Sequence, residues 1–156
     1  MAFLQERFGA DLKLLGNLEF QNDRARGSDL FYGTRPETRQ VDLQTLAGNE
    51  NLEQALLLRF LTPMGELALL GHPDYGSRLS ELIGELNNDT NRNRAKMYVL
   101  QALALEPRIK KVLRLTVTPN LARRDQIDIS MTLSVIDSDT PLNLVFPFFL
   151  QGGGKP

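Results

Sequence analysis

The sequence predicts an α+β domain: an N-terminal arm, about three helices, and a small antiparallel three-stranded sheet formed by the C-terminal part. Two observations predict this class. Between residues 51 and 106 the apolar residues recur with a helical period, and from Arg108 onward they alternate with polar residues, as in half-buried strands. Helices followed by a run of strands are typical of a sheet that carries its helices on one face.

The chain has 156 residues, which suffice for one domain with a substantial core but not for two comfortable ones. Residues 1–48 show no clear periodicity and predict an extended or irregular arm, in which only Asp11–Leu15 looks strand-like. Residues 49–150 form the predicted folded domain, and the glycine-rich residues 151–156 predict a flexible tail.

The first helix is predicted over residues 51–61. Asn51 can cap its N-terminus, and Gln54 stands three residues later, as in a capping box. Pro63 and Gly65 end this helix, because proline disfavours helix at the preceding residue and glycine suits a turn.

A short extended piece is expected over Glu66–Leu70. Ser77 is then expected to cap a short helix that runs to Leu86. A third helix is expected over residues 90–106, after the capping candidates in residues 88–90. It carries an apolar stripe, which is widened by Met97, Leu100 and Ala104, and Pro107 stops it.

Three strands are predicted over residues 108–118, 127–135 and 142–150. In the first strand, simple alternation puts four residues on one face: Ile109, Leu113, Leu115 and Val117. The third strand contains Pro147, which cannot donate to a ladder, so this strand is expected to be an edge of the sheet at that point.

Composition excludes several classes of function. Lys plus Arg number 18 and Asp plus Glu 19, a near-neutral balance that argues against a nucleic-acid binder. The chain has no cysteine, so disulfides and thiolate metal sites are excluded. No apolar run approaches the length of a membrane span, and the N-terminus lacks the features of a secretory signal. We therefore expect folding in the cytoplasm and no membrane insertion.

Catalytic patterns are weak. His72 is the only histidine, and no nucleophile or orienting partner accompanies it. The segment 152–155 is not a phosphate loop, because no Ser or Thr and no helix follow it. Three carboxylates, those of Glu66, Asp74 and Glu106, leave a glycosidase pair as an open alternative, but no spacing rule selects two of them.

Two features indicate partners. The Glu106 carboxylate opposes the helix dipole at a C-terminus, so either Arg108 or a basic group on a partner is expected to compensate it. The apolar strand 142–150 would favour aggregation if its edge were left open. It is therefore expected to be covered by the chain's own arm, covered by a partner, or paired with another chain by strand addition.

Three segments carry a resemblance to a known family. They are Leu58–Leu67, Pro73–Leu79 and Glu106–Ile109, the last of which is followed by alternating strands. In this order and spacing they resemble the baseplate-wedge and sheath-initiator family of contractile phage tails. That family includes the phage W-type proteins, the TssE-type component of type VI secretion systems and the sheath initiators of extracellular contractile injection systems. The similarity spans roughly residues 50–150.

The resemblance implies a structural baseplate protein and not an enzyme, with about six copies in each particle by family analogy. It implies that Glu106, Pro107 and Arg108 contact wedge proteins, and that a turn is formed by Thr62, Pro63, Gly65 and Glu66. The sheet is then expected to offer its edge to sheath subunits through Leu144, Phe146, Phe148 and Leu150. The central hub or inner tube is a further expected neighbour.

The family is sometimes labelled lysozyme-like, which keeps a small peptidoglycan hydrolase as the alternative function. The motifs do not distinguish a phage tail from a type VI system or an extracellular injection device. In each case the protein would be assembled in the bacterial cytoplasm and become part of the particle.

Overall fold

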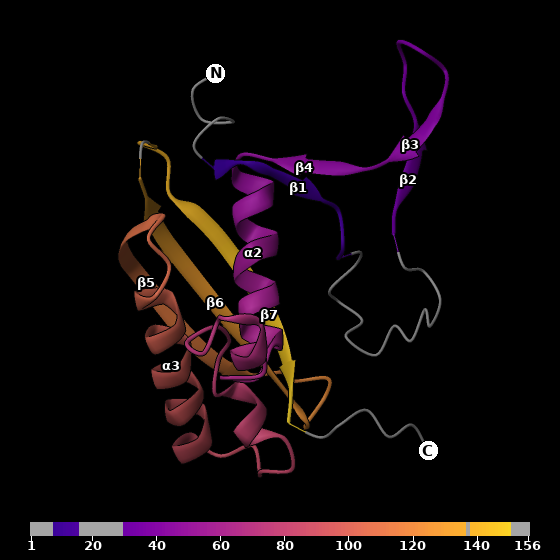
Figure 1. The fold of residues 1–156 in the computed structure, drawn as a ribbon. Helices are drawn as coiled ribbons and strands as arrows, with labels where there is room; N and C mark the ends of the chain where they lie inside the picture. The colour runs from indigo at the N-terminus through magenta and orange to yellow at the C-terminus, as the bar shows by residue number, and fades with distance from the viewer. Residues whose placement is uncertain (1–7, 16–29, 137, 151–156) are drawn as a thin grey trace, which may run out of the picture. The chain divides into compact units, whose positions relative to one another are not determined.

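The computed structural model describes residues 8–15, 30–136 and 138–150. The expected flexible tail, residues 151–156, lies outside the described residues. The chain divides into two compact units, residues 1–55 and 56–156, and the boundary falls inside helix α2 (Figure 1). The predicted α+β class is confirmed, because two helices pack on a C-terminal three-stranded antiparallel sheet and small hairpins precede them.

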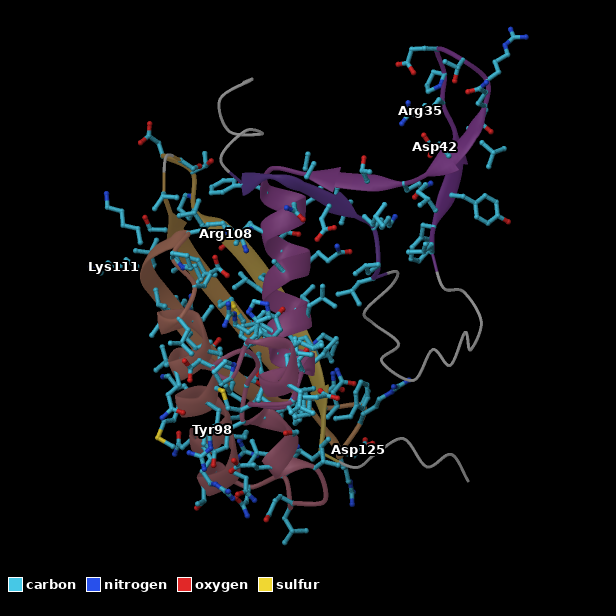
Figure 2. All side chains as sticks on the ribbon, viewed as in Figure 1. Arg35, Asp42, Tyr98, Arg108, Lys111 and Asp125 are labelled. Carbon is cyan, nitrogen blue, oxygen red and sulfur yellow. The ribbon has the colours of Figure 1, made fainter. Side chains whose placement is uncertain are left out.

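The first unit contains four strands of three residues each: β1 (Ala10–Leu12), β2 (Tyr32–Thr34), β3 (Val41–Leu43) and β4 (Thr45–Ala47). β1 pairs with β4 and β2 pairs with β3, both antiparallel. An ion pair between Arg35 and Asp42 links the two strands of the β2–β3 hairpin (Figure 2). The described part of the expected arm is therefore partly ordered as strands.

Helix α2 (Asn49–Leu61) begins two residues before the predicted cap. Asn51 lies inside the helix, and its side chain donates to the carbonyl of Phe8 at 2.8 Å. Gln54 donates to the carbonyl of Leu12 at 2.8 Å and accepts from the amides of Leu14 and Leu15 at 2.8 and 3.1 Å. The expected capping box is thus wrong, because both side chains bind the main chain around β1.

A tight turn follows α2. The segments 62–65 and 75–77 bond to each other through three main-chain hydrogen bonds, which run from the amides of Met64, Gly65 and Ser77. Ser77 also donates its hydroxyl to the carbonyl of Phe60 at 2.9 Å and is buried. Gly76 has a φ of 111°, and a Cβ there would lie 2.6 Å from the carbonyl oxygens of residues 62 and 63. Only glycine fits at position 76, where the segment 75–77 passes close to the main chain of residues 62 and 63.

Two short segments differ from the sequence-based expectations. The piece over Glu66–Leu70, predicted to be extended, is a turn that leads into the 3-10 helix η2 (Ala68–Leu70). The helix predicted over 77–86 is a single 3-10 turn, η3 (Leu79–Leu82), which ends before Gly84 at φ 95°. Local apolar spacing does not distinguish these turns from longer elements.

Helix α3 (Asp89–Ala104) confirms the third predicted helix. The side chain of Asn88 caps it by accepting from the amide of Asn91 at 2.8 Å. Its core side is formed by Ala95, Tyr98, Val99, Ala102 and Leu103. The predicted widening of this side is wrong, because Met97, Leu100 and Ala104 are exposed.

The sheet of the second unit has the order β5-β6-β7, formed by β5 (Ile109–Pro119), β6 (Gln126–Val135) and β7 (Leu142–Phe149). All three predicted strands are therefore confirmed. On the face of β6 that carries Met131, the paired residues are Leu115 on β5 and Leu144 on β7. This face bears the core, and the ring of Phe60 from α2 lies 5.6 Å from that of Phe146.

Two irregularities change the faces of β5. The register shifts between Ile109 and Lys111 and again between Val112 and Arg114. Val112 therefore pairs with Leu133 in the inward-facing row, while Leu113 is 50% exposed. Simple alternation predicted Leu113 on the inner face. The extra residue of the first bulge puts Val112 there instead, and the second bulge restores the predicted alternation at Leu115.

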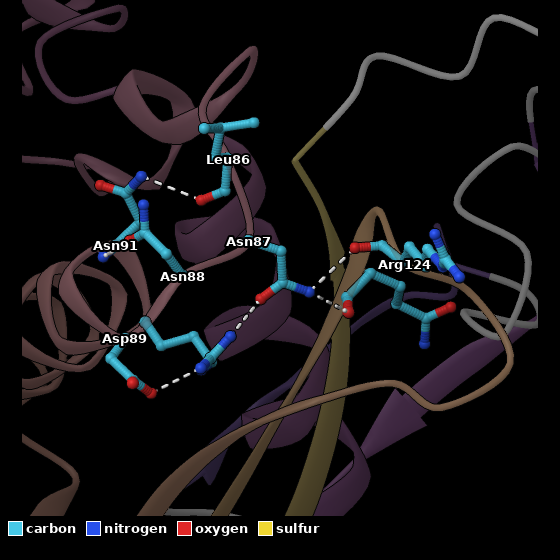
Figure 3. A network of polar contacts seen from close by, with 8 residues as sticks. Leu86, Asn87, Asn88, Asp89, Asn91 and Arg124 are labelled. Carbon is cyan, nitrogen blue, oxygen red and sulfur yellow. Dashed lines mark hydrogen bonds and ion pairs between the residues drawn. The ribbon is translucent and has the colours of Figure 1, made fainter.

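Two clusters of polar side chains hold loops of the second unit against its helix α3 and its β5–β6 hairpin. Glu81 accepts two hydrogen bonds from Arg78 and one from the hydroxyl of Tyr98, which ties η3 to α3. Asn87 donates to the carbonyls of Arg124 and Gln126 (Figure 3). These bonds fix the loop before α3 against the β5–β6 hairpin. No helix in the described part of the chain is long and apolar enough to cross a membrane.

Candidate functional site

The candidate site is the corner where α3 gives way to β5. Leu105 closes the helix, its amide bonding to the carbonyls of Ala102 and Leu103. Glu106 and Pro107 then redirect the chain, and β5 begins at Ile109. The helix ends here because proline cannot continue it.

Glu106 lies between two guanidinium groups. Its side chain is 5% exposed, its Oε1 accepts from Arg108 Nε at 2.6 Å, and its Oε2 lies 3.5 Å from Arg59 Nη2. The sequence left open whether Arg108 or a basic group on a partner compensates Glu106. Arg108 does so, because its guanidinium forms an ion pair with this carboxylate. Arg59, from the end of α2, adds a second positive charge that sequence reasoning missed.

The balance of forces at Glu106 favours the ionised form. Burial raises the pKa of this carboxyl, but the hydrogen bond and charge of Arg108 and the charge of Arg59 outweigh burial and lower it overall. The corner is therefore an ion-pair cluster of one buried carboxylate and two guanidinium groups, and it connects α2, α3 and β5. A carboxylate held in this way is a poor proton donor at neutral pH.

Arg59 also contributes to a depression beside the corner. Its guanidinium stacks over the ring of Tyr75 at 4.7 Å. The Arg59 Nε is buried and has no hydrogen-bond partner among the described residues. The depression has a volume of about 280 Å³, and its lining consists of Arg59, residues 71–75 and Leu105. Burial raises the pKa of the Tyr75 phenol, which keeps the ring neutral.

The second candidate surface is the edge of the sheet. β7 pairs with β6 alone among the described residues. The four residues expected to contact sheath strands, Leu144, Phe146, Phe148 and Leu150, all have side chains in the core. The exposed side chains of β7 are Asn143 and Val145, the latter 62% exposed. Any added strand would therefore bond to the main chain of β7 and lie beside Val145.

The residues of the expected turn lie together after α2. The amide of Glu66 bonds to the carbonyl of Pro63 at 3.1 Å, and Gly65 has a φ of 81°. Thr62 donates its hydroxyl to the carbonyl of Leu58 at 2.7 Å. The amide of Gly65 also bonds to the carbonyl of Tyr75 at 3.2 Å, so this turn helps to position Tyr75 under the Arg59 guanidinium.

The carboxylates considered for catalysis lie in different environments. Glu66 and Asp74 are exposed, whereas Glu106 is buried and neutralised. His72 lines the depression, and its side chain forms no hydrogen bond or ion pair with another described residue. Within the described ranges, no group of three or more histidine, aspartate or glutamate side chains could hold a metal ion.

The fold and the corner define a class: an α+β domain in which two helices pack on a three-stranded antiparallel sheet, with a buried carboxylate between two arginines at the junction of helix and strand. No protein-family model matches the chain, and no curated protein matches it. Among solved structures, the chain is similar to the crystal structure of a protein from Geobacter sulfurreducens named "putative tail lysozyme". The two are 28% identical with a TM-score of 0.58, and the match covers 67% of this chain and 93% of that chain. The resemblance to the tail-protein family is therefore confirmed.

Proposed function

We propose that the chain is a structural component of a contractile tail or injection system, which docks on the baseplate wedge and nucleates the sheath by strand addition. One observation carries this proposal: β7 is a long apolar strand that pairs with β6 alone among the described residues. Strand addition gives affinity through main-chain hydrogen bonds, while alternating side chains set the register.

The corner supplies the second half of the proposal. Arg108 is partly exposed next to the buried Glu106, so it can present a positive charge whose position is fixed by the carboxylate. Wedge proteins would dock on this corner, and sheath subunits would meet the β7 edge. The hub or inner tube is a further neighbour in this scheme, and about six copies would set the symmetry of the first sheath ring. No cofactor is required.

The alternative is a peptidoglycan hydrolase, favoured by the name of the similar Geobacter sulfurreducens protein. A glycosidase acid needs a raised pKa, whereas Arg108 and Arg59 lower that of Glu106. This supports a non-enzymatic role. The alternative predicts that purified protein clears cell-wall substrate, and that Glu66→Gln or Glu106→Gln abolishes the clearing.

Electron microscopy of particles assembled with and without this protein tests the structural proposal. We expect baseplates without sheaths when the protein is absent, and sheathed particles when it is restored. Normal sheaths on particles that lack the protein would overturn the nucleating role. Absence of the wild-type chain from purified baseplates would overturn the docking role.

A further inference from the structure

One face of the sheet in the second unit carries mostly polar side chains and lies opposite the core. Its rows, paired across the strands, are Lys111–Ser134, Arg114–Thr132–Asn143 and Thr116–Ser130–Val145. Each of these residues is exposed or half-buried, whereas the side chains of the core lie on the other face. Val145 is the apolar member of these rows, so a partner on this outer face would bind mainly through polar contacts.

Positive charge gathers at one end of this outer face. Lys111 and Arg114 are exposed, and their partners on β6 are two residues apart, so the two side chains leave the strand about 7 Å from each other. Lys110, the extra residue of the first bulge, places a third exposed cation beside them. None of the three forms an ion pair with a described residue. Like charges at this spacing repel one another, so an acidic group from another molecule would be attracted to them.

The described carboxylates of the sheet and its β6–β7 loop leave this charge unpaired. Asp128 lies on the same face, but it is four residues along β6 from the partner of Arg114, about 13 Å away. That separation exceeds the Debye length of about 8 Å at physiological salt. The two oxygens of Asp128 accept from Asn120 at 2.9 Å and from Gln126 at 2.6 Å. Asp139, in the β6–β7 loop, forms no ion pair with any described residue.

We infer that the positive end of this outer face, built around Lys111 and Arg114, is a docking surface for an acidic, extended segment of another protein. Alternate residues of an extended segment lie on one side and about 7 Å apart, which matches the spacing of the two cations. The Ser134 hydroxyl, which has no hydrogen-bond partner among the described residues, can donate to the same carboxylates. Nucleic acid fits less well, because a chain with 18 Lys plus Arg and 19 Asp plus Glu has no basic excess to neutralise phosphates. The inference goes beyond the proposed function, which uses the Glu106 corner and the β7 edge.

A labelled octapeptide of alternating Glu and Ser tests this surface on the purified chain, without any particle. Fluorescence anisotropy at low salt should show binding that weakens as salt is added, and a peptide with Gln in place of Glu should not bind. Lys111→Gln combined with Arg114→Gln should weaken binding about fivefold, the size expected for the loss of two exposed ion pairs. Lys96→Gln combined with Arg124→Gln removes the same charge from exposed residues elsewhere and should leave binding unchanged.

Carbodiimide coupling in purified particles that contain the chain then identifies the partner. This reagent joins a lysine amine to a carboxylate in direct contact with it. Mass spectrometry should therefore find Lys111 joined to an Asp or Glu of another protein. Lys111→Arg keeps the charge but cannot be coupled, so the joined product should disappear. The exposed Lys96 is the control lysine and should not join the same segment.

Several results would overturn the inference. These are equal weakening of peptide binding by the two pairs of substitutions, no coupling at Lys111 in particles that contain the chain, and coupling to another copy of the chain alone. Tighter binding of an oligothymidylate than of the acidic peptide, lost only with Lys111→Gln and Arg114→Gln, would assign the surface to nucleic acid instead. Absence of the chain from particles would overturn the proposed function, and the peptide measurement would still decide the inference.

Discussion

At the scale of single residues, Glu106 makes the free energy of unfolding depend on pH in the acidic range. Its folded pKa is lowered, so the stabilisation is complete above the unfolded pKa of about 4.3 and is lost as pH falls through the folded value. Glu106→Gln should therefore cost roughly 3 kcal/mol of unfolding free energy at pH 7, because it removes one partner of a buried ion pair.

Urea unfolding at pH 7, and at the lowest pH where both proteins fold, measures this dependence. The difference between wild type and Glu106→Gln should shrink in acid, while the exposed Glu66→Gln should change little at either pH. A difference that is equal at both values would mean that Glu106 contributes packing but not charge.

Gly76 is a second residue whose identity is imposed by its surroundings. Gly76→Ala must place a Cβ 2.6 Å from two carbonyl oxygens, whereas Gly71, with a φ of 87°, has nothing within 4 Å. Gly71→Ala should cost about 1–2 kcal/mol for its left-handed backbone. Gly76→Ala should cost roughly 1–3 kcal/mol more because of the clash. Thermal unfolding of the two variants compares these costs, and equal losses would contradict the close approach described for Gly76.

At the scale of elements, the bulges in β5 decide which residues support the core. Val112 pairs with Leu133 and is half-buried, whereas Leu113 is mostly in solvent. Val112→Ser should therefore cost roughly 1–2 kcal/mol of unfolding free energy. Leu113→Ser should stay within about 0.5 kcal/mol of wild type. Simple alternation of the strand predicts the reverse order, so urea unfolding of the two variants distinguishes the registers.

The same strand shows what the sequence can and cannot predict. The three strands and α3 follow from local periodicity, and the Glu106–Arg108 pair follows from a spacing of two residues. The bulges and the binding of β1 by Gln54 depend on partners far away in the chain. Arg59 and Tyr75 were missed for the same reason: only the turn over residues 62–77 brings them to the corner.

At the scale of the whole molecule, the proposed function gives the two edges of the sheet different roles. β5 and β7 are both terminal strands in the order β5-β6-β7, and each carries an exposed apolar residue, Leu113 and Val145. These residues form a matched pair, since both are at least half exposed on an edge strand. A lysine at an edge is a common device that discourages the addition of another strand.

Val145→Lys should therefore reduce the fraction of baseplates that carry a sheath, because an added strand would place its own side chains directly beside position 145. Leu113→Lys should leave that fraction unchanged, and both variants should unfold within about 0.5 kcal/mol of wild type. Electron microscopy of particles from cells that express each variant in place of the native chain counts sheathed and bare baseplates. Equal counts for the two variants would mean that β7 is not the edge on which the sheath begins. A loss confined to Leu113→Lys would assign that role to β5.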